Sequence, residues 1–462
     1  MSQASQLIAA QYREAELIKR QYANAIYIVT SYGIYPDGND YSALLNQLIS
    51  SISGGIIHFP AGTYIIGDTI RIKSDIVIQG SSVDATIIKL MNATNKTMLD
   101  ASGSKNVTIR NLTVDGNNSN QTSGHGLWFH TASNFLIEDV KVINCKNNGI
   151  SCWQDAKGII DRCDVSYCGG SGIRTVFGTS CLLIRNTVCS YCDESGILLE
   201  HAPYSLLDNC ETHHCTAQGE NSNGFSIQTD NVTLRECKAH DNYNYGIYIT
   251  GANAIVDSCR LYSNTIGGLD LYNGNNLRSG FIIKNNYFTN NLGSGFTAFW
   301  AADLICSNNI IKSNSHDGID FDGVQHCVIK ENVISGNAYY GIKLRTSGSY
   351  QTTDMQVSDN DLSRNTQGTH LLTNVGRYLY LKNNIGQSPV GPITTPGVPV
   401  SNAELVNPFP HDVRMAIKGG TVTDIKINGI STGLSGGLLP LSTSESVILV
   451  YSVAPTWTWI GV

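Results

Sequence analysis

The sequence has few charged residues, and its positive charges are not clustered. Asp, Glu, Lys and Arg make up 15% of the 462 residues, and the formal net charge is -7. Proteins that bind nucleic acids contact the phosphates with groups of Lys and Arg side chains. The absence of such a group predicts that nucleic acid is not a partner.

Long apolar runs are also missing. A helix that spans a membrane needs about 18 or more consecutive apolar residues, and no segment approaches that length. The N-terminal segment MSQASQLIAAQYREAELIKRQ lacks the charged and then apolar pattern of a secretory signal peptide. We therefore expect no membrane insertion, no signal peptide, and synthesis in a cytosol.

Glycine and asparagine are abundant instead. The 45 Gly residues and frequent Asn residues favour many short strands joined by tight turns over long solvated helices. The 13 Cys residues would suggest disulfides in a small secreted protein, but here they recur at regular spacing in a long chain. The composition therefore predicts an all-β fold whose cysteines pack inside it.

An internal repeat is the strongest signal in the chain. A small or polar residue, a Gly and then alternating apolar residues recur in ten phrases, which begin at Gly126, Gly149, Gly172, Gly196, Gly224, Gly246, Gly268, Gly295, Gly318 and Gly341. Each interval is too short for a strand, a helix and a second strand, and the phrase alternates as a strand does. The repeat predicts a solenoid of three-sided β-coils.

Two columns of Cys and Asn run in step with this phrase. The first is Val140, Cys163, Thr187, Cys210, Cys237, Cys259, Asn286, Asn309, Asn332 and Asn360; the second is Cys145, Cys168, Cys192, Cys215, Asn242, Asn264, Asn291, Asn314, Asn337 and Asn365. Asn side chains stacked at strand spacing hydrogen-bond from coil to coil, and a small buried thiol fits the same position. A thiophilic metal site is the alternative, but no set of His ligands accompanies the cysteines, so no metal is expected.

The N-terminal segment, residues 1–30, is predicted to be helical. Apolar residues recur at steps of three and four over residues 5–26, namely Leu7, Ile8, Ala15, Ile18, Tyr22 and Ala25. Such a helix would either cap the open end of the first coil or contribute to a short trimeric coiled coil.

From Tyr32 the chain reads SYGIYPDGNDYSALLNQLISSISGGIIHFPAGTYIIGDTIRIKSDIVIQG. This segment resembles the opening module of the pectate-lyase-like superfamily, in which a YG-x-x-x-DG-x-x-D phrase leads into a helix and a GG-x-I-x-FP-x-GTY-x-I phrase forms the first coil. The resemblance covers about residues 30–110, and the repeats extend it to about residue 385. It implies a right-handed parallel β-helix over residues 31–385. It does not imply one activity, because lyases, hydrolases, epimerases and phage tailspikes share the fold.

The C-terminal part is predicted to be separate from the solenoid. Residues 386–400 are rich in Pro and Gly and favour a linker. Residues 401–462 alternate with the period of strands and predict a small antiparallel β domain, which resembles the compact C-terminal modules of phage tail proteins. Trp457 and Trp459 share one strand face, so they either fill a core or form a platform for a sugar or a trimer contact.

The outer face of the Gly-led strands is the candidate site. Residues two and four places after each Gly are expected to face solvent, and they combine aromatic side chains with acids and bases, as a polysaccharide groove requires. The predicted substrate-binding residues on and beside this face are Trp153, Arg174, His201, Tyr248, Tyr272, Phe299, Trp300, Lys343 and Arg345.

Glycoside hydrolysis needs two carboxyl groups, about 5 Å apart or about 6.5–9.5 Å apart according to mechanism. Asp320 and Asp322 are neighbours on one predicted strand face, and Asp270 lies two coils earlier, roughly 9–10 Å away at strand spacing. The grouping, followed by Lys343-Leu344-Arg345, distantly resembles that of polygalacturonases. Their Gly-His-Gly element is absent, so their substrate and mechanism do not carry over.

Two alternatives to this aspartate group stay open. Lys343 and Arg345 are expected to stack beside Asp320 and Asp322, so the group could be no more than charge pairing across strands, which disfavours an acid role. Glu200 is the competing catalytic candidate, because less polar neighbours would raise its pKa towards that of a general acid, and His201 is adjacent.

A lyase is the second kind of enzyme to consider. It needs a base near the C5 proton of the sugar and stabilisation of the charge at the sugar's carboxylate, often through Ca²⁺ held by several acids, and Arg174, Lys343 or Arg345 could serve. No dense acidic cluster is present, so no cofactor is expected unless the protein is a lyase.

Three functions follow. The leading hypothesis is a homotrimeric phage or prophage tailspike, located in a virion tail or outside the cell after lysis, that binds and hydrolyses a polysaccharide of the bacterial surface. The others are a free bacterial enzyme acting on a pectin-type polymer and a receptor-binding tail protein without turnover.

Overall fold

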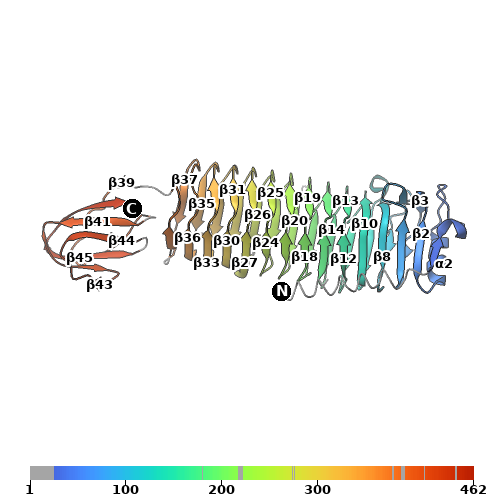
Figure 1. Ribbon diagram of the computed structural model, residues 1–462, viewed down its shortest axis with the longest axis horizontal. Coiled ribbons are helices and arrows are strands. Elements are labelled where there is room, and N and C mark those ends of the chain that lie inside the picture. Colours follow the sequence, from blue (N-terminus) through green and yellow to red (C-terminus); the bar gives the residue numbers. More distant parts are fainter. Residues whose placement is uncertain are drawn as a thin grey trace. The chain divides into compact units, whose positions relative to one another are not determined.

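The computed structural model describes residues 25–178, 181–216, 222–272, 274, 276–376, 379–386, 391–409, 412–442 and 445–461. The chain forms two compact units. The first comprises Met1–Gly274 and Gly280–Gly293, and the second comprises Asn275–Ser279 and Ser294–Val462. Figure 1 labels the elements of both along the chain. In the described part, no helix is long and apolar enough to cross a membrane.

A typical coil of the first unit contains three short strands. One coil consists of β11 (Ile150–Trp153), β12 (Lys157–Asp161) and β13 (Asp164–Ser166). Each strand pairs in parallel with its equivalent in the next coil, as Ile150 does with Ile173 and Asp164 with Val188. The in-register repeat predicted from the Gly-led phrases is therefore confirmed, and the fold is a right-handed parallel β-helix.

The strands follow one pattern throughout the solenoid. The Gly-led side consists of β4 (Ile70–Arg71), β7 (Leu99–Asp100), β9 (Leu127–His130), β11, β14 (Ile173–Val176), β17 (Ile197–Glu200), β20 (Phe225–Gln228), β23 (Tyr245–Ile249) and β26 (Gly267–Tyr272) in the first unit, and β29 (Ser294–Phe299), β32 (Ile319–Asp322), β35 (Tyr340–Arg345) and β37 (Gly368–Thr373) in the second.

The other two sides complete the coils. One has β1 (Ile26–Ile28), β2 (Gly55–Phe59), β5 (Ile76–Gly80), β8 (Thr108–Asp115), β10 (Ser133–Ile143), β12, β15 (Leu182–Arg185), β18 (Leu206–Asp208), β21 (Thr233–Arg235), β24 (Ile255–Asp257), β27 (Arg278–Lys284), β30 (Ala301–Ser307), β33 (Gln325–Lys330), β36 (Thr353–Ser358) and β38 (Leu379–Lys382). The last, the third side, has β3 (Gly62–Ile66), β6 (Thr86–Leu90), β13, β16 (Val188–Ser190), β19 (Glu211–His213), β22 (Lys238–His240), β25 (Arg260–Tyr262), β28 (Tyr287–Thr289), β31 (Ile310–Lys312) and β34 (Val333–Ser335). The long strands β8 and β10 run along both of these sides.

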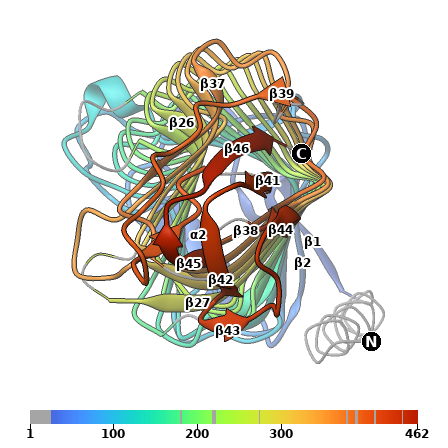
Figure 2. The ribbon, with the colours of Figure 1, turned by 90° about the vertical axis from the view of Figure 1, so that its left-hand side faces the viewer.

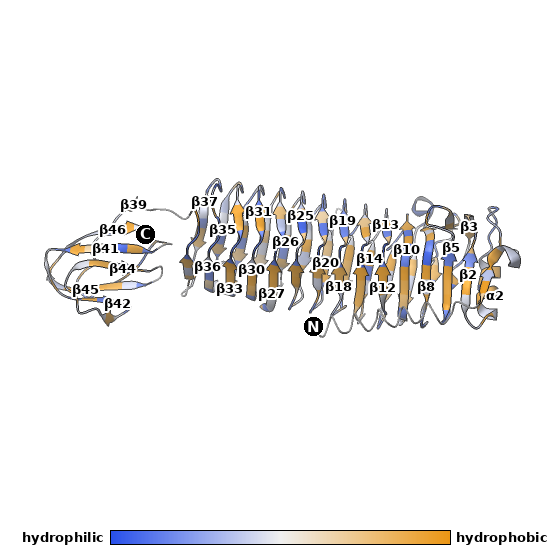
Figure 3. Cartoon of the chain, in the orientation of Figure 1, coloured by the Kyte–Doolittle hydropathy of each residue, from blue (hydrophilic) through white to orange (hydrophobic). Residues whose placement is uncertain are grey.

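Tight corners and apolar interiors explain why the sequence coils in this way. Arg162 and Tyr167, which follow β12 and β13, adopt left-handed backbone with φ of 52° and 57°, so the chain changes direction at one residue. Between corners, alternate side chains point inward, and Ile160, Val165 and Ile173 are fully buried. Figure 3 shows this alternation as orange and blue segments along single strands.

The Asn and Cys columns lie inside the coils, as predicted. Asn242 donates to Asn264 at 3.0 Å, and Asn264 donates to Asn291 at 3.1 Å, each in a fully buried position. The 13 cysteines are free and buried, and burial raises the pKa of the Cys163 thiol to about 12. Buried thiols thus occupy places that Asn takes in later coils, which confirms their packing role. Among the described residues, no group of three or more His, Cys, Asp or Glu is arranged to hold a metal ion.

The beginning of the solenoid corrects one boundary. The predicted helix over residues 5–26 lies almost entirely outside the described residues, but Ile26–Ile28 forms strand β1, which pairs with β2, and the 3-10 helix η1 (Val29–Tyr32) follows. The helical segment therefore does not extend to residue 30, because its apolar residues there join a sheet. The helix expected after the DG-x-x-D phrase is confirmed as α2 (Ser42–Ser51), where Asp40 accepts a hydrogen bond from the Ser42 backbone N–H at 2.9 Å. The other helical segment among the described residues is the 3-10 turn η2 (Asn118–Asn120).

The predicted C-terminal β domain is present as two antiparallel sheets that face each other (Figure 2). One contains β39 (Gly391–Pro392), β46 (Thr456–Gly461), β41 (Val413–Lys418) and β44 (Gly437–Leu441); the other contains β40 (Glu404–Val406), β45 (Ser446–Val453), β42 (Thr421–Ile427) and β43 (Ile430–Ser431). Trp457 and Trp459 are buried in the core between them with Met415 and Leu449. Core filling, and not a sugar platform, is therefore their role.

The predicted linker is partly incorporated into this domain. Gly391 pairs with Gly461, the Trp457 indole N–H donates to the Pro396 carbonyl at 2.7 Å, and the Trp459 backbone N–H donates to the Thr395 hydroxyl at 3.0 Å. The domain therefore begins near residue 391 and not at 401. Proline has no backbone N–H, but its carbonyl accepts hydrogen bonds like that of any other residue, so a Pro-rich segment can still pack onto a sheet.

Candidate functional site

The outer face of the Gly-led strands is less open than expected. Ser151, Leu198 and Ser226 were expected to face solvent, and all three are buried. Ser151 pairs in register with Trp128 on one side and Arg174 on the other, and these large side chains cover it. The predicted direction of the side chains holds, but exposure at each position depends on the size of its neighbours.

An aromatic row crosses the first unit on this face. The ring centres of Trp128 and Trp153 are 5.0 Å apart, and those of Trp153 and Phe177 are 5.5 Å apart. Phe177 is 59% exposed, and the His125 ring lies 4.8 Å from Trp128 on the other end. Such a row offers apolar ring surface to the C–H groups of a sugar. Of these residues, only Trp153 was among the predicted binding residues.

The Trp153 indole N–H is covered and has no hydrogen-bond acceptor in the described part of the chain. Leaving a buried donor unpaired costs roughly 1–3 kcal/mol, and such groups are rare in folded proteins.

Arg174 lies between two carboxylates beside the aromatic row. Its Nε donates to Glu200 Oε2 at 2.9 Å, and its second contact is with Glu194 Oε2 at 3.8 Å. The three side chains keep 32%, 23% and 38% of their surface exposed, in the order Arg174, Glu200 and Glu194. A ligand on the surface can therefore reach two carboxylates and a cation together.

A chain of hydrogen bonds connects this group to His125. Ser171 donates to Glu194 at 2.9 Å, the Ser171 backbone N–H donates to Asn148 Oδ1, and Asn148 donates to Ser151 at 3.2 Å. Ser151 in turn lies 3.1 Å from His125 Nδ1. Burial, assisted by the charge of Arg174, lowers the pKa of His125 to about 4, so the imidazole is neutral at pH 7.

The aspartate group in the second unit is closed. Asp320 accepts hydrogen bonds from Lys343 at 3.1 Å and from Arg345 Nε at 3.0 Å. Arg345 also contacts Asp322 at 3.0 Å, and Lys343 contacts Asp317 at 3.4 Å. Burial opposes the charged form of Arg345, but the hydrogen bond and charge of Asp320 outweigh it and raise the pKa of the guanidinium.

Further contacts hold this group in place. Ser347 donates to Asp322 from both its backbone N–H and its hydroxyl, and the Arg345 guanidinium lies 5.6 Å from the centre of the Phe299 ring. All three aspartates are buried. The arrangement agrees with charge pairing across strands, the alternative to catalysis by Asp320 and Asp322.

The remaining predicted residues are dispersed. The Tyr248 and Tyr272 rings stack at 6.4 Å, and Tyr248 pairs in register with Asp270, which is buried. His201 is exposed and follows Glu200 at a left-handed corner, and the Trp300 ring lies 5.9 Å from Tyr350. Asp270 belongs to the first unit and Asp320 to the second, so their separation stays a prediction.

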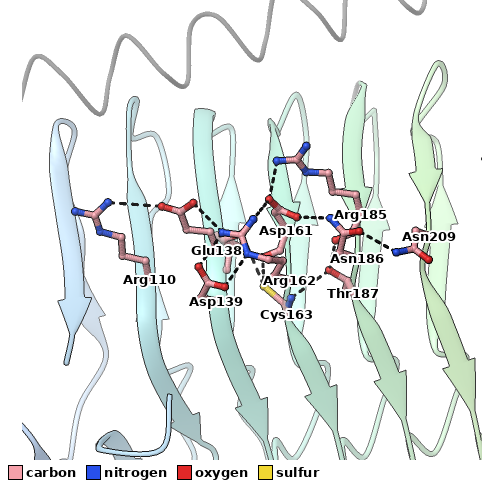
Figure 4. Close-up of polar contacts among 11 residues, drawn as sticks. Arg110, Glu138, Asp139, Asp161, Arg162, Cys163, Arg185, Asn186, Thr187 and Asn209 are labelled. Carbon is pink, nitrogen blue, oxygen red and sulfur yellow. Dashed lines mark hydrogen bonds and ion pairs between the residues drawn. The ribbon is translucent and has the colours of Figure 1, made fainter. Parts of the chain in front are cut away.

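A third group of charges lies on strands β8, β10, β12 and β15 of the first unit (Figure 4). Arg162 contacts Asp161 at 2.5 Å, Asp139 at 2.8 Å and Glu138 at 3.4 Å, and Arg185 contacts Asp161 at 2.6 Å. Asp161 also accepts a hydrogen bond from Asn186 at 2.9 Å. Each acid in this group meets a base from its own or a neighbouring coil, so we assign it to the cohesion of the coils.

Sequence reasoning missed His125 and Glu194. Both lie in the segments just before a Gly-led strand, outside the alternating positions that were examined for the site. Their proximity in sequence to Gly126 and Gly196 could have identified them, because the position of a residue next to a strand end is fixed by that strand.

Comparison with known proteins supports the fold over most of the chain. The family model for the right handed beta helix region matches residues 23–227, 125–281 and 223–385. The A-module of a mannuronan C-5 epimerase from Azotobacter vinelandii superposes with a TM-score of 0.59 at 17% identity, over 79% of this chain and 100% of that module. A likeness at this identity concerns the fold alone.

Two curated relatives come from bacteriophages. The pre-neck appendage protein of Bacillus phage phi29 is 25% identical over 215 residues, which is 43% of this chain and 24% of that protein. The pre-neck appendage protein of Bacillus phage B103 is 24% identical over 202 residues, which is 40% of this chain and 22% of that protein. The matches thus cover about a quarter of the length of these relatives.

Proposed function

We propose that this chain, which belongs to the right-handed beta helix family, is a bacteriophage tail appendage that binds and hydrolyses a polysaccharide of the bacterial surface. The fold alone does not define this activity. The similarity to two pre-neck appendage proteins supports the virion location. The observation that carries the enzymatic part is Arg174 held between Glu194 and Glu200 next to the aromatic row.

The binding step uses the aromatic row. Sugar rings of the polymer lie against Trp128, Trp153 and Phe177, because pyranose C–H groups pack on aromatic faces. The neutral His125 at the end of the row accepts or donates a hydrogen bond to a hydroxyl.

The chemical step uses the two glutamates. Glycoside hydrolysis needs one carboxyl group that donates a proton to the leaving oxygen and one carboxylate that activates water or attacks the sugar. Glu200 accepts a hydrogen bond from Arg174 Nε at 2.9 Å, which orients it for the carboxylate role. Glu194, whose contact with Arg174 is longer at 3.8 Å, is assigned the role of proton donor.

The assembly is proposed to be a homotrimer, as is expected of a tailspike. Light scattering after size-exclusion chromatography measures the mass directly, and a trimer has three times the 50.0 kDa of the chain. A monomer would contradict the appendage proposal and favour a free enzyme.

Polymer digestion tests the activity. The full chain is incubated with capsular, wall-teichoic and pectic polymers while reducing ends and absorbance from new double bonds are followed. New reducing ends without new absorbance support hydrolysis. Absorbance from double bonds shows a lyase and overturns hydrolysis, and binding without either product shows a receptor-binding protein without turnover.

A further inference from the structure

A second surface, on the third side of the coils in the first unit, has the geometry of a ligand site. Strands β19, β22, β25 and β28 are three residues long, and their first and third side chains point outward. In register, Lys238, Arg260 and Tyr287 form one row, while His240, Tyr262 and Thr289 form the other. None of these residues belongs to the site on the Gly-led strands.

A column of stacked rings runs along the second row. The ring centres of His213 and His240 are 5.0 Å apart with planes 10° from parallel, and those of His240 and Tyr262 are 4.7 Å apart at 5°. The next residue in register is Thr289, which has no ring. The column therefore stops at Tyr262, and the small Thr side chain leaves the place of the next ring vacant.

A pocket of about 410 Å³ lies at this point, lined by Lys238, Arg260, Tyr262, Tyr287 and Thr289. Its volume is within the range of small-ligand pockets. Burial, with the charge of Glu211, raises the pKa of the Tyr262 hydroxyl, which stays protonated and can donate to a ligand.

The charges of the pocket leave one cation without a carboxylate. Lys238 contacts Glu211 at 3.1 Å, and His240 contacts Glu211 at 3.0 Å and Asp241 at 2.7 Å. The Arg260 guanidinium instead lies 5.4 Å from the centre of the Tyr287 ring, and no ion pair joins it to an acid in the part of the chain that the structure describes. The ring orients the guanidinium while leaving its N–H groups available to an anion.

We propose that this pocket binds one pyranose residue of an acidic polysaccharide. The sugar ring continues the column by stacking on Tyr262 in the space above Thr289, and its anionic substituent pairs with Arg260 beside Lys238. The shared chemistry is a sugar ring with a negative group, either a carboxylate of a uronic acid or a phosphate. The site thus anchors an anionic chain apart from the surface proposed for hydrolysis.

Calorimetric titration of the full chain with defined probes tests this proposal. Trigalacturonate represents the carboxylate, glucose 1-phosphate the phosphate, and galactotriose the neutral sugar. The site predicts that an anionic probe binds at least tenfold more tightly than the neutral one and that binding weakens as salt is added. Equal affinity for galactotriose and both anions, or no heat with any anionic probe, would overturn the proposal.

Two substitutions locate the binding. Arg260→Gln removes the charge, and Thr289→Tyr places a ring where the sugar would stack; each is expected to weaken anionic probe binding at least tenfold. Lys141→Gln removes a cation from the same row outside the pocket and is expected to leave binding unchanged. Circular dichroism confirms that the variants are folded. Wild-type affinity in both pocket variants would contradict the assignment.

The outcome is separable from that of the proposed hydrolysis. If the wild-type chain cleaves no polymer but binds the anionic probe in a way that depends on Arg260, the proposed hydrolysis is refuted and the pocket assignment stands. Cleavage together with wild-type probe affinity in Arg260→Gln would refute the pocket alone.

Discussion

The two charged groups on the Gly-led strands differ in how far their charges are satisfied. In the second unit, Asp320 and Asp322 are buried and bound by Lys343, Arg345 and Ser347. In the first unit, Glu200 shares one guanidinium with a second glutamate, and its side chain stays 23% exposed. The same residue types therefore form a closed structural network in one place and an open site in the other.

The difference lies in burial and in how closely each acid is held. Asp320 is buried and accepts hydrogen bonds from both Lys343 and Arg345 of β35, whereas the Glu194 side chain is 38% exposed and lies 3.8 Å from the Arg174 that it shares with Glu200. Buried charges are tolerated when they are paired and hydrogen-bonded, so full pairing indicates a contribution to stability. Incomplete pairing beside exposed aromatic rings indicates a role in binding.

The largest effect is expected from Glu200→Gln. Removing one of the two proposed catalytic carboxylates should lower turnover of the polymer at least about 100-fold, while thermal stability changes little because surface pairs contribute about 0–1 kcal/mol. Reducing-end assays measure the first and thermal denaturation the second. Glu331→Gln, an exposed acid beside Lys330, is the matched control. Unchanged turnover in Glu200→Gln would show that the open group, formed by Arg174, Glu194 and Glu200, is not the catalytic site.

The reverse pattern is expected from Asp320→Asn. The amide leaves Lys343 and Arg345 partly uncompensated, which should lower the free energy of unfolding by about 3 kcal/mol. Turnover per folded molecule should stay near that of the wild type. Urea denaturation and the reducing-end assay give the two quantities. A large loss of turnover with stability intact would restore Asp320 as a catalytic residue and reverse the comparison.

Much of the fold could be predicted because the repeat fixes which residues stack. Once the phrase at Gly149 and the phrase at Gly172 are aligned, the pairing of Ile150 with Ile173 follows, since a slip by one residue would turn the apolar side chains outward. The Cys and Asn columns were predictable for the same reason, because a buried position in every coil selects small or hydrogen-bonding side chains.

The site was less predictable because the spacing of residues in the repeat does not determine how exposed each side chain is. Ser151 and Arg174 occupy equivalent positions, yet one is covered by neighbours and the other reaches solvent. Glu194 and His125 approach the strand face from the preceding turns, which the alternation does not describe. The choice between the two charged groups likewise depends on side-chain geometry, such as both Lys343 and Arg345 reaching Asp320.

A smaller effect is expected from pH on the open group. The pKa of His125 is about 4 in the folded protein, below the model-compound value of 6.5, so the unfolded chain binds more protons between these values. Stability should therefore fall as the pH is lowered from about 6.5 to 4, by about 2 kcal/mol after allowing for partial exposure. Denaturation midpoints of wild type and His125→Gln across this range measure it. If the two proteins lose stability in parallel over the window, His125 is not the responsible group.

The smallest effect is expected at the edge of the aromatic row. Phe177→Ala removes an exposed ring that packs on Trp153, so polymer binding should weaken about threefold to tenfold, as expected for an aromatic contact of about 0.5–1.5 kcal/mol. Tyr204→Ala, which removes another exposed ring of the first unit, should have no such effect. Titration of the polymer against both variants makes the comparison. Equal weakening in both would mean that exposed rings act non-specifically, and the open group would then lose the aromatic surface that distinguishes it from the closed one.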